Sequence, residues 1–152
     1  MSQFHFESED EVLAAADIIL TAKARTGCLQ MCSPKDGGRF FRSKIASEER
    51  EVFSVAFLDS QHRLITFEIL FQGTVDSAHV YPREVVKAAL AFNASAVIVA
   101  HNQPSGITEP SNSDRRITDR LKQALDFVDI PLLDHLIVSE NSVTSLAELG
   151  ML

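Results

Sequence analysis

The sequence is poor in several residue types that mark specialised chains. Its 152 residues include two cysteines, six glycines, five prolines and no tryptophan. Cys28 and Cys32 lack the second cysteine pair that a zinc-binding cysteine motif needs, so we expect two free thiols beside Gly27. With so little glycine and proline, the chain has no low-complexity segment and no internal repeat.

Positive charge is also scarce. Lysine and arginine number 14 against 21 acidic residues, which gives a net charge of -7. Phosphate backbones repel such a chain unless a local basic patch compensates. Asp119 and Asp126 interrupt the basic cluster formed by Arg115, Arg116, Arg120 and Lys122. We therefore expect a solvated helix face there and no nucleic-acid partner.

Long apolar runs are missing as well. The longest stretches are too short to cross a bilayer, and residues 1–11 are polar and acidic, unlike a signal peptide. We expect a cytoplasmic protein with no membrane association. At 45% apolar residues, the chain can bury about two-thirds of its unfolded surface around one core.

The apolar pattern predicts strands that alternate with helices after an opening hairpin. Residues 51–58 and 65–71 form the hairpin, 95–100 are a strand buried on both faces, and 132–138 are a further strand. Helices are expected at 9–25, from Ser33-Pro34, from Tyr81-Pro82 and at 111–129. This order predicts an α/β fold with a mixed β-sheet covered by helices in three layers.

A polar group follows the buried strand. If the backbone stays extended, His101 and Gln103 point to the same side, because strand side chains alternate. Asp114 precedes Ile117 by three residues, on the inward face of the helix that begins near Ser111. An imidazole, an amide oxygen and a carboxylate with one open position are typical of a catalytic zinc site.

A simpler interpretation of the same residues needs no metal. Ser111 and Asp114 have the spacing of a helix capping box, with aspartate in place of glutamate. His135, on the last predicted strand, is expected to be a hydrogen-bonded structural histidine.

A zinc hydrolase also needs a base that accepts a proton from the attacking water. Glu51 and Glu68 are the candidates in the hairpin, and the pattern alone does not choose between them.

A resemblance separates the two acids. Glu51, His101-x-Gln103, Ser111 and Asp114 resemble the JAMM (MPN) metalloprotease motif, Glu then His-x-His-x7-Ser-x2-Asp. Five longer segments resemble the bacterial RadC-like family: FQGT (71–74), YPREV (81–85), AHNQPSG (100–106), EPS (109–111) and LDHLIV (133–138). The resemblance covers roughly residues 47–152 and implies a JAMM/MPN (cytidine-deaminase-like) architecture. The chain looks like the short form, without the family's N-terminal helix-hairpin-helix region.

The resemblance implies roles for single residues. His101 and Asp114 would bind one zinc ion per chain, Glu51 would polarise the attacking water, and Ser111 would stabilise the oxyanion. Gln103 stands where the family has a histidine ligand. An amide oxygen is a poorer zinc donor than an imidazole nitrogen, so we expect weakened zinc affinity.

Residues 1–46 are expected to form a helical extension packed on a JAMM/MPN RadC-like domain at 47–152, as one structural unit. The leading hypothesis is a zinc-dependent metallopeptidase or isopeptidase that acts on a peptide or protein substrate. One alternative is a metal-free binding scaffold that has lost its activity through Gln103. Another is a DNA-repair-associated accessory module, the role historically linked to RadC-like proteins.

Overall fold

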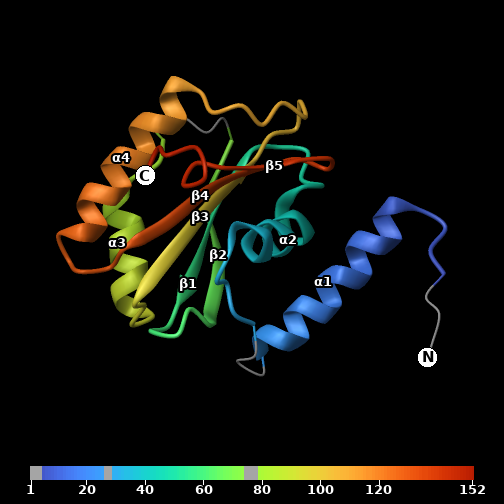
Figure 1. Cartoon of the computed structure of the whole chain (residues 1–152), viewed down its shortest axis with the longest axis horizontal. Coiled ribbons are helices and arrows are strands. Elements are labelled where there is room, and N and C mark those ends of the chain that lie inside the picture. The colour runs from blue at the N-terminus through green and yellow to red at the C-terminus, as the bar shows by residue number, and fades with distance from the viewer. Residues whose placement is uncertain (1–4, 26–28, 74–78) are drawn as a thin grey trace.

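A mixed β-sheet lies at the centre of the molecule. The computed structural model describes residues 5–25, 29–73 and 79–152. The described residues form a five-stranded sheet in the order β2-β1-β3-β4-β5 (Figure 1). Its strands are β1 (Val52–Leu58), β2 (Leu64–Gln72), β3 (Ala96–Asn102), β4 (Leu132–Val138) and β5 (Val143–Ser145).

The strand directions bring two chain segments to one edge of the sheet. β1 runs antiparallel to both β2 and β3, and β5 runs antiparallel to β4. β3 and β4 are parallel neighbours, so their carboxyl ends lie at the same edge. His101 is paired with Phe53 on one side and with Ile137 on the other.

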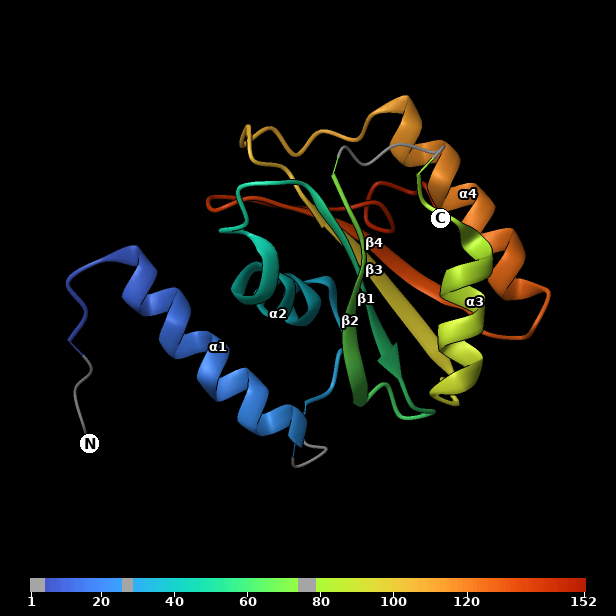
Figure 2. The same cartoon turned by 180° about the vertical axis from the view of Figure 1, so that it is seen from behind.

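Helices cover both faces of the sheet. α3 (Pro82–Ala91) and α4 (Asn112–Asp126) lie on one face, and α2 (Pro34–Ile45) lies on the other (Figures 1 and 2). α1 (Glu9–Arg25) packs outside α2 and touches β2. Ser33 caps α2 by accepting a hydrogen bond from the Asp36 backbone, and proline begins both α2 and α3.

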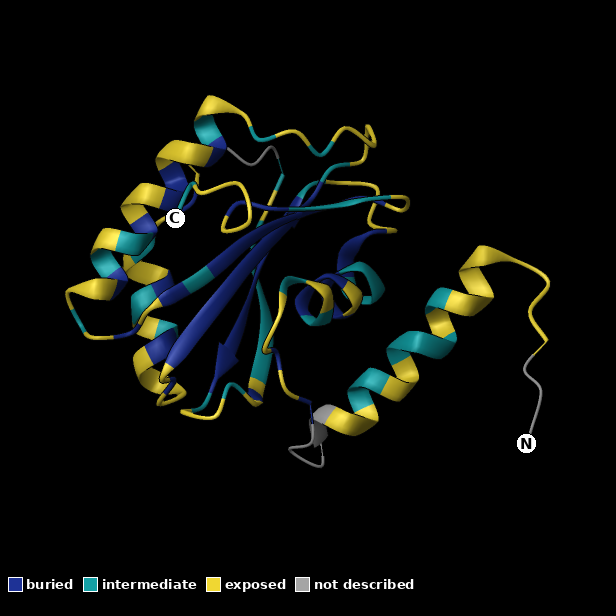
Figure 3. Ribbon diagram, viewed as in Figure 1, coloured by how far each residue is buried: buried dark blue, intermediate teal, exposed yellow. Residues whose placement is uncertain are grey.

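Each face of the sheet has its own apolar core. The core beneath α2 includes Phe40, Phe41 and Ile98, and the core beneath α3 and α4 includes Val99 and Ile117. Alternation along β3 supplies both cores, which is why every β3 residue is buried (Figure 3). His101 has the same parity as Val99, and it therefore faces α4.

The predicted elements are largely confirmed. The helix at 9–25 and the strand at 132–138 have the predicted bounds, and the hairpin is present. The prediction that α4 reaches residue 129 was wrong by one turn: α4 ends at Asp126, because the chain leaves the helix in a turn at 127–129, where Asp129 has a left-handed backbone (φ 59°). β5 is three residues long, too short to show an alternating pattern, and was not predicted.

Two further predictions concern the cysteines and the domain boundary. Cys28 lies outside the described residues, and Cys32 is an exposed free thiol. The domain boundary at residue 46 stays a prediction, although α2 contributes Phe40, Phe41 and Ile45 to the core. Within the described ranges, no helix has the length and apolar character needed to span a membrane.

Candidate functional site

The carboxyl end of β3 holds a buried histidine beside the start of α4. His101 is 2% exposed, and its Nε2 lies 3.5 Å from Oδ1 of Asp114, which is 4% exposed. The structure therefore brings together two of the predicted site residues. This separation is longer than an ordinary N–H···O hydrogen bond, for which about 2.7–3.2 Å is usual.

Asp114 serves the helix terminus and the site at once. Its Oδ2 accepts a hydrogen bond from the Ser111 backbone at 2.8 Å, and its own backbone N–H donates to Ser111 Oγ at 3.1 Å. The capping box is thus present. Because only Oδ2 is used in the cap, Oδ1 remains directed at His101. The capping and metal-site interpretations are compatible, since they use different oxygens of one carboxylate.

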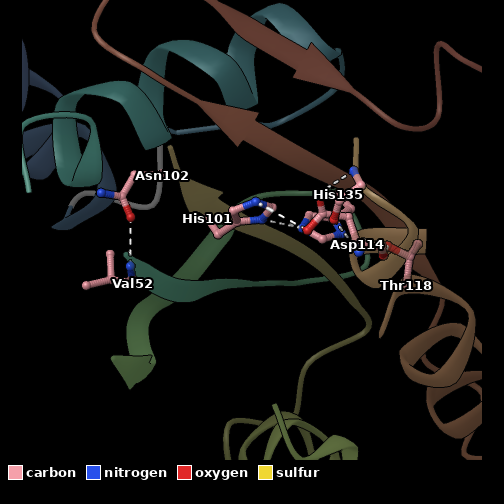
Figure 4. Close-up of polar contacts among 7 residues, drawn as sticks. Val52, His101, Asn102, Asp114, Thr118 and His135 are labelled. Atoms are coloured by element: carbon pink, nitrogen blue, oxygen red, sulfur yellow. Dashed lines mark hydrogen bonds and ion pairs between the residues drawn. The ribbon is translucent and has the colours of Figure 1, made fainter. Parts of the chain in front are cut away.

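A second histidine extends the buried network behind His101. His101 Nδ1 lies 2.9 Å from His135 Nε2, and His135 Nδ1 lies 2.6 Å from Thr118 Oγ1 (Figure 4). Thr118 Oγ1 in turn donates to the Asp114 carbonyl at 2.6 Å, which closes the network on α4. The prediction that His135 is a hydrogen-bonded structural histidine is confirmed, but its partner is a site residue.

Burial sets the charge of the two rings. It lowers the pKa of His101 below its ordinary value of 6.5, while the carboxylates of Asp114 and Glu51 act in the opposite direction. The pKa of His135 is held well below 6.5, first by burial and then by its neighbour His101. Both imidazoles are therefore neutral at neutral pH, the form in which a histidine can bind a metal.

The segment that carries Glu51 is fixed from the opposite side of β3. The Asn102 side chain, fully buried, accepts a hydrogen bond from the Val52 backbone at 2.7 Å. Its amide nitrogen donates to the carbonyls of Glu48 at 3.1 Å and Arg50 at 2.9 Å (Figure 4 shows the Val52 contact). Three bonds from one side chain therefore determine where the chain enters β1.

Glu51 and Gln103 are brought together at the surface. Both line an open surface depression, together with Glu49, Arg50 and Ser105. Glu51 precedes β1 by one residue and is near enough to His101 to influence its pKa. The rival acid, Glu68, pairs with Val55 in the middle of the hairpin. Gln103 continues the pairing beyond β3, since its backbone donates to Val138 at 2.8 Å.

The donors at this edge fit a zinc ion in part. His101 Nε2 and Asp114 Oδ1 face each other, and neither ring nor carboxylate is exposed. A third ligand of the usual kind is absent: the described residues contain no group of three or more His, Cys, Asp or Glu side chains able to hold a metal. Gln103, an amide, is the remaining predicted donor, and it would make the set complete but weaker.

Ser111 is the N-cap residue of α4. It is exposed at the N-terminus of α4, and its Oγ accepts the Asp114 backbone N–H. Accepting that bond leaves the hydroxyl proton available for donation.

Sequence reasoning missed Thr118 and Asn102. Thr118 lies one helical turn after Asp114 on the same buried face, a spacing that could have revealed it. Asn102 gave a different signal, a polar residue at the end of an otherwise apolar strand. Neither residue stands out without the neighbours that the fold brings to it.

Comparisons with known proteins show which family the chain is similar to. The model of the RadC-like JAB domain family matches residues 31–151. A UPF0758 protein of Marinomonas sp. is 59% identical over 112 residues, which are 74% of this chain and 50% of the relative. One of Cellvibrio japonicus is 54% identical over 141 residues, 93% of this chain and 62% of the relative. One of Vibrio cholerae is 53% identical over 145 residues, 95% of this chain and 90% of the relative. The chain thus spans about half to three-fifths of the first two relatives and most of the third.

Proposed function

We propose that this chain, which belongs to the RadC-like JAB domain family, is a zinc-dependent hydrolase that cleaves a peptide or isopeptide amide bond. One observation carries the proposal: His101 Nε2 and Asp114 Oδ1, both on buried residues, face each other 3.5 Å apart, and Glu51 is near enough to influence the pKa of His101. A histidine nitrogen and a carboxylate oxygen so arranged are the start of an open catalytic metal site.

The residues around this pair have complementary tasks in the proposal. When bound, zinc supplies a Lewis acid that activates water and polarises a carbonyl. Glu51 accepts the proton that the attacking water releases and passes it to the leaving amine. Ser111, whose Oγ already accepts one bond from the helix, donates its proton to the carbonyl oxygen as negative charge develops there.

Gln103 makes the proposed site weaker than the family pattern. Its amide oxygen replaces an imidazole nitrogen, so charge at the site is unchanged while the donor is poorer for zinc. We expect the chain to bind zinc reversibly and to lose it to a chelator.

The same residue supports a second candidate, a binding scaffold without chemistry. It is favoured by the lack, among the described residues, of three His, Cys, Asp or Glu side chains around one point. The scaffold retains the fold, binds no zinc and gains hydrolysis when Gln103→His restores the family's ligand.

Turnover of a panel of peptides and isopeptides separates the two candidates. The zinc-loaded parent is compared with Glu51→Gln, which removes the proton acceptor and preserves the size of the side chain. Hydrolysis that falls by at least about 100-fold in Glu51→Gln supports the proposed mechanism. Equal turnover in the two proteins refutes it, and activity that appears only in Gln103→His identifies the parent as a scaffold.

A further inference from the structure

Three buried side chains behind the site form a hydrogen-bonded chain that has a direction. It runs from Thr118 on α4 through His135 on β4 to His101 on β3, and all three side chains are at most 2% exposed. Side chains so inaccessible to solvent take their hydrogen-bond partners from neighbouring protein groups.

The direction is set at Thr118. Its Oγ1 lies 2.6 Å from the Asp114 carbonyl oxygen and 2.6 Å from His135 Nδ1. The carbonyl can only accept, and the hydroxyl has a single proton, so this proton goes to Asp114. The bond to His135 must then be donated by the ring, and His135 carries its proton on Nδ1.

The next bond follows from the first. A neutral imidazole has one donor nitrogen and one acceptor nitrogen, so Nε2 of His135 is an acceptor. The ring nitrogen 2.9 Å away is Nδ1 of His101, which must therefore donate. His101 then has a lone pair on Nε2, the atom that faces Asp114 Oδ1.

The opposite direction is disfavoured at the Thr118 end. It would leave Thr118 Oγ1 and the Asp114 carbonyl 2.6 Å apart with no proton between them, which is strongly repulsive. At the other end it would place a proton on His101 Nε2, where Asp114 Oδ1 at 3.5 Å attracts it only weakly, beyond ordinary hydrogen-bond length, so the direction is decided at Thr118.

We propose that Thr118 and His135 are positioning residues that hold the proton of His101 on Nδ1, so that Nε2 presents its lone pair toward Asp114. Two lone pairs then face one point, an arrangement that a cation relieves. The tautomer follows from the hydrogen bonds alone, whereas its use in holding zinc rests on the proposed function. Partners behind a ligand commonly set its tautomer and basicity in this way.

The tautomer is measured directly by long-range ¹H–¹⁵N correlation NMR of the histidine rings in metal-free protein at pH 7.5. The chain has five histidines, and His101→Gln and His135→Gln assign the two buried rings. We expect both rings to carry the proton on Nδ1. A wild-type spectrum with the His101 proton on Nε2 overturns the proposal.

Substitutions at Thr118 test whether its hydroxyl sets the tautomer of His101. Thr118→Val keeps the shape and removes the hydroxyl, whereas Thr118→Ser keeps the hydroxyl as the matched control. We expect Thr118→Val to shift the His101 proton toward Nε2, and Thr118→Ser to retain the wild-type tautomer. Thermal unfolding checks that each variant folds. If Thr118→Val does not fold, the wild-type and Thr118→Ser spectra still show which ring nitrogen of His101 carries the proton.

Zinc affinity adds a second readout, measured by chelator competition in the parent and in a Gln103→His background that binds more tightly. Thr118→Val is expected to weaken affinity by about 10-fold or more, and Thr118→Ser to leave it nearly unchanged. Unchanged affinity in Thr118→Val contradicts the role toward zinc. Because the NMR readout needs neither zinc nor turnover, a protein that hydrolyses nothing refutes the proposed function and leaves the tautomer assignment standing.

Discussion

His101 and Asn102 are neighbours in sequence and equally inaccessible, yet they do different work on opposite faces of β3. His101 faces α4, where its Nε2 meets a carboxylate without a hydrogen bond to it. Asn102 faces the other way and satisfies three backbone groups of the segment at 48–52. On the His101 face a ring nitrogen and a carboxylate oxygen face each other without a hydrogen bond, whereas the Asn102 side chain is hydrogen-bonded through both its oxygen and its nitrogen.

This difference shows how one strand end can position an entire site. Asn102 fixes the chain on both sides of Glu51, while His101 meets the start of α4. Both tasks depend on strand alternation, which sends consecutive side chains to opposite faces. Two consecutive polar residues at the end of an apolar strand can therefore have two separate functions.

The largest effect on stability is expected on the Asn102 face. Asn102→Leu keeps the approximate volume but leaves the buried Val52 N–H without an acceptor and removes two further bonds. The free energy of unfolding should fall by about 3 kcal/mol in urea titrations. Ser54→Ala, which removes one buried bond to the Ala100 carbonyl between the same strands, is the control and should cost about 1 kcal/mol. Equal costs would contradict the role of Asn102 in holding three backbone groups at once.

The next effect is a pH dependence that arises from the buried histidines of the His101 face. The pKa of His135 is held below 6.5 in the folded state, so the unfolded chain binds more protons as the pH falls. Stability is therefore complete above pH 6.5 and falls below it, by up to about 1.4 kcal/mol per pH unit for each buried histidine.

Urea titrations of metal-free protein at several pH values between 7.5 and 5 measure this slope. His135→Gln should make it shallower by about one proton, because one buried titrating group is gone. A parent whose stability does not change with pH in this range would contradict the neutral, buried state of the pair.

Ser111 caps α4, the helix that carries Asp114. Ser111→Ala removes the side-chain acceptor for the Asp114 backbone, and the free energy of unfolding should decrease by about 1 kcal/mol. Ser111→Thr preserves both the cap and the hydroxyl and should stay within about 0.5 kcal/mol of the parent. A large loss of turnover in Ser111→Ala with turnover retained in Ser111→Thr would assign the hydroxyl to chemistry. Equal turnover in both would limit Ser111 to capping.

The smallest effect on stability is expected where the effect on binding is greatest. Asp114→Asn retains an oxygen that can accept the Ser111 backbone bond and removes only the charge that faces His101. The free energy of unfolding should change by less than about 1 kcal/mol, while zinc affinity should fall by at least about 10-fold. Chelator competition and thermal unfolding of the same preparations measure both. A variant that binds zinc like the parent would remove Asp114 from the site.

Much of the fold was predictable, because alternating apolar residues mark the strands and capping residues mark the starts of helices. The strand at 132–138 and the helix at 9–25 have the predicted bounds. The end of α4 was not predictable from apolar spacing, since Val128 continues the stripe while the backbone has already left the helix. Asp129 supplies the left-handed turn, a conformation that periodicity does not report.

The site was predictable only where chemistry and spacing coincide. His101 and Asp114 were found from their residue types and places in the pattern, and they do meet. Glu51 could not be distinguished from Glu68 until a resemblance separated them. Strand alternation does not show which of the two hairpin strands lies next to β3. Thr118 and Asn102 each left a local signal, but His135 lies 17 residues from Thr118 and Glu48 lies 54 residues from Asn102, so these bonds could not be read from the sequence.

Zinc content tests the central claim most directly. The parent, Gln103→His and Asp114→Asn are purified identically, loaded with zinc, dialysed against graded chelator concentrations and submitted to elemental analysis. We predict near one zinc per chain in Gln103→His, zinc that the parent loses at lower chelator concentration, and little zinc in Asp114→Asn. Zinc held equally by all three proteins, or by none of them, would contradict a metal site built from His101, Gln103 and Asp114.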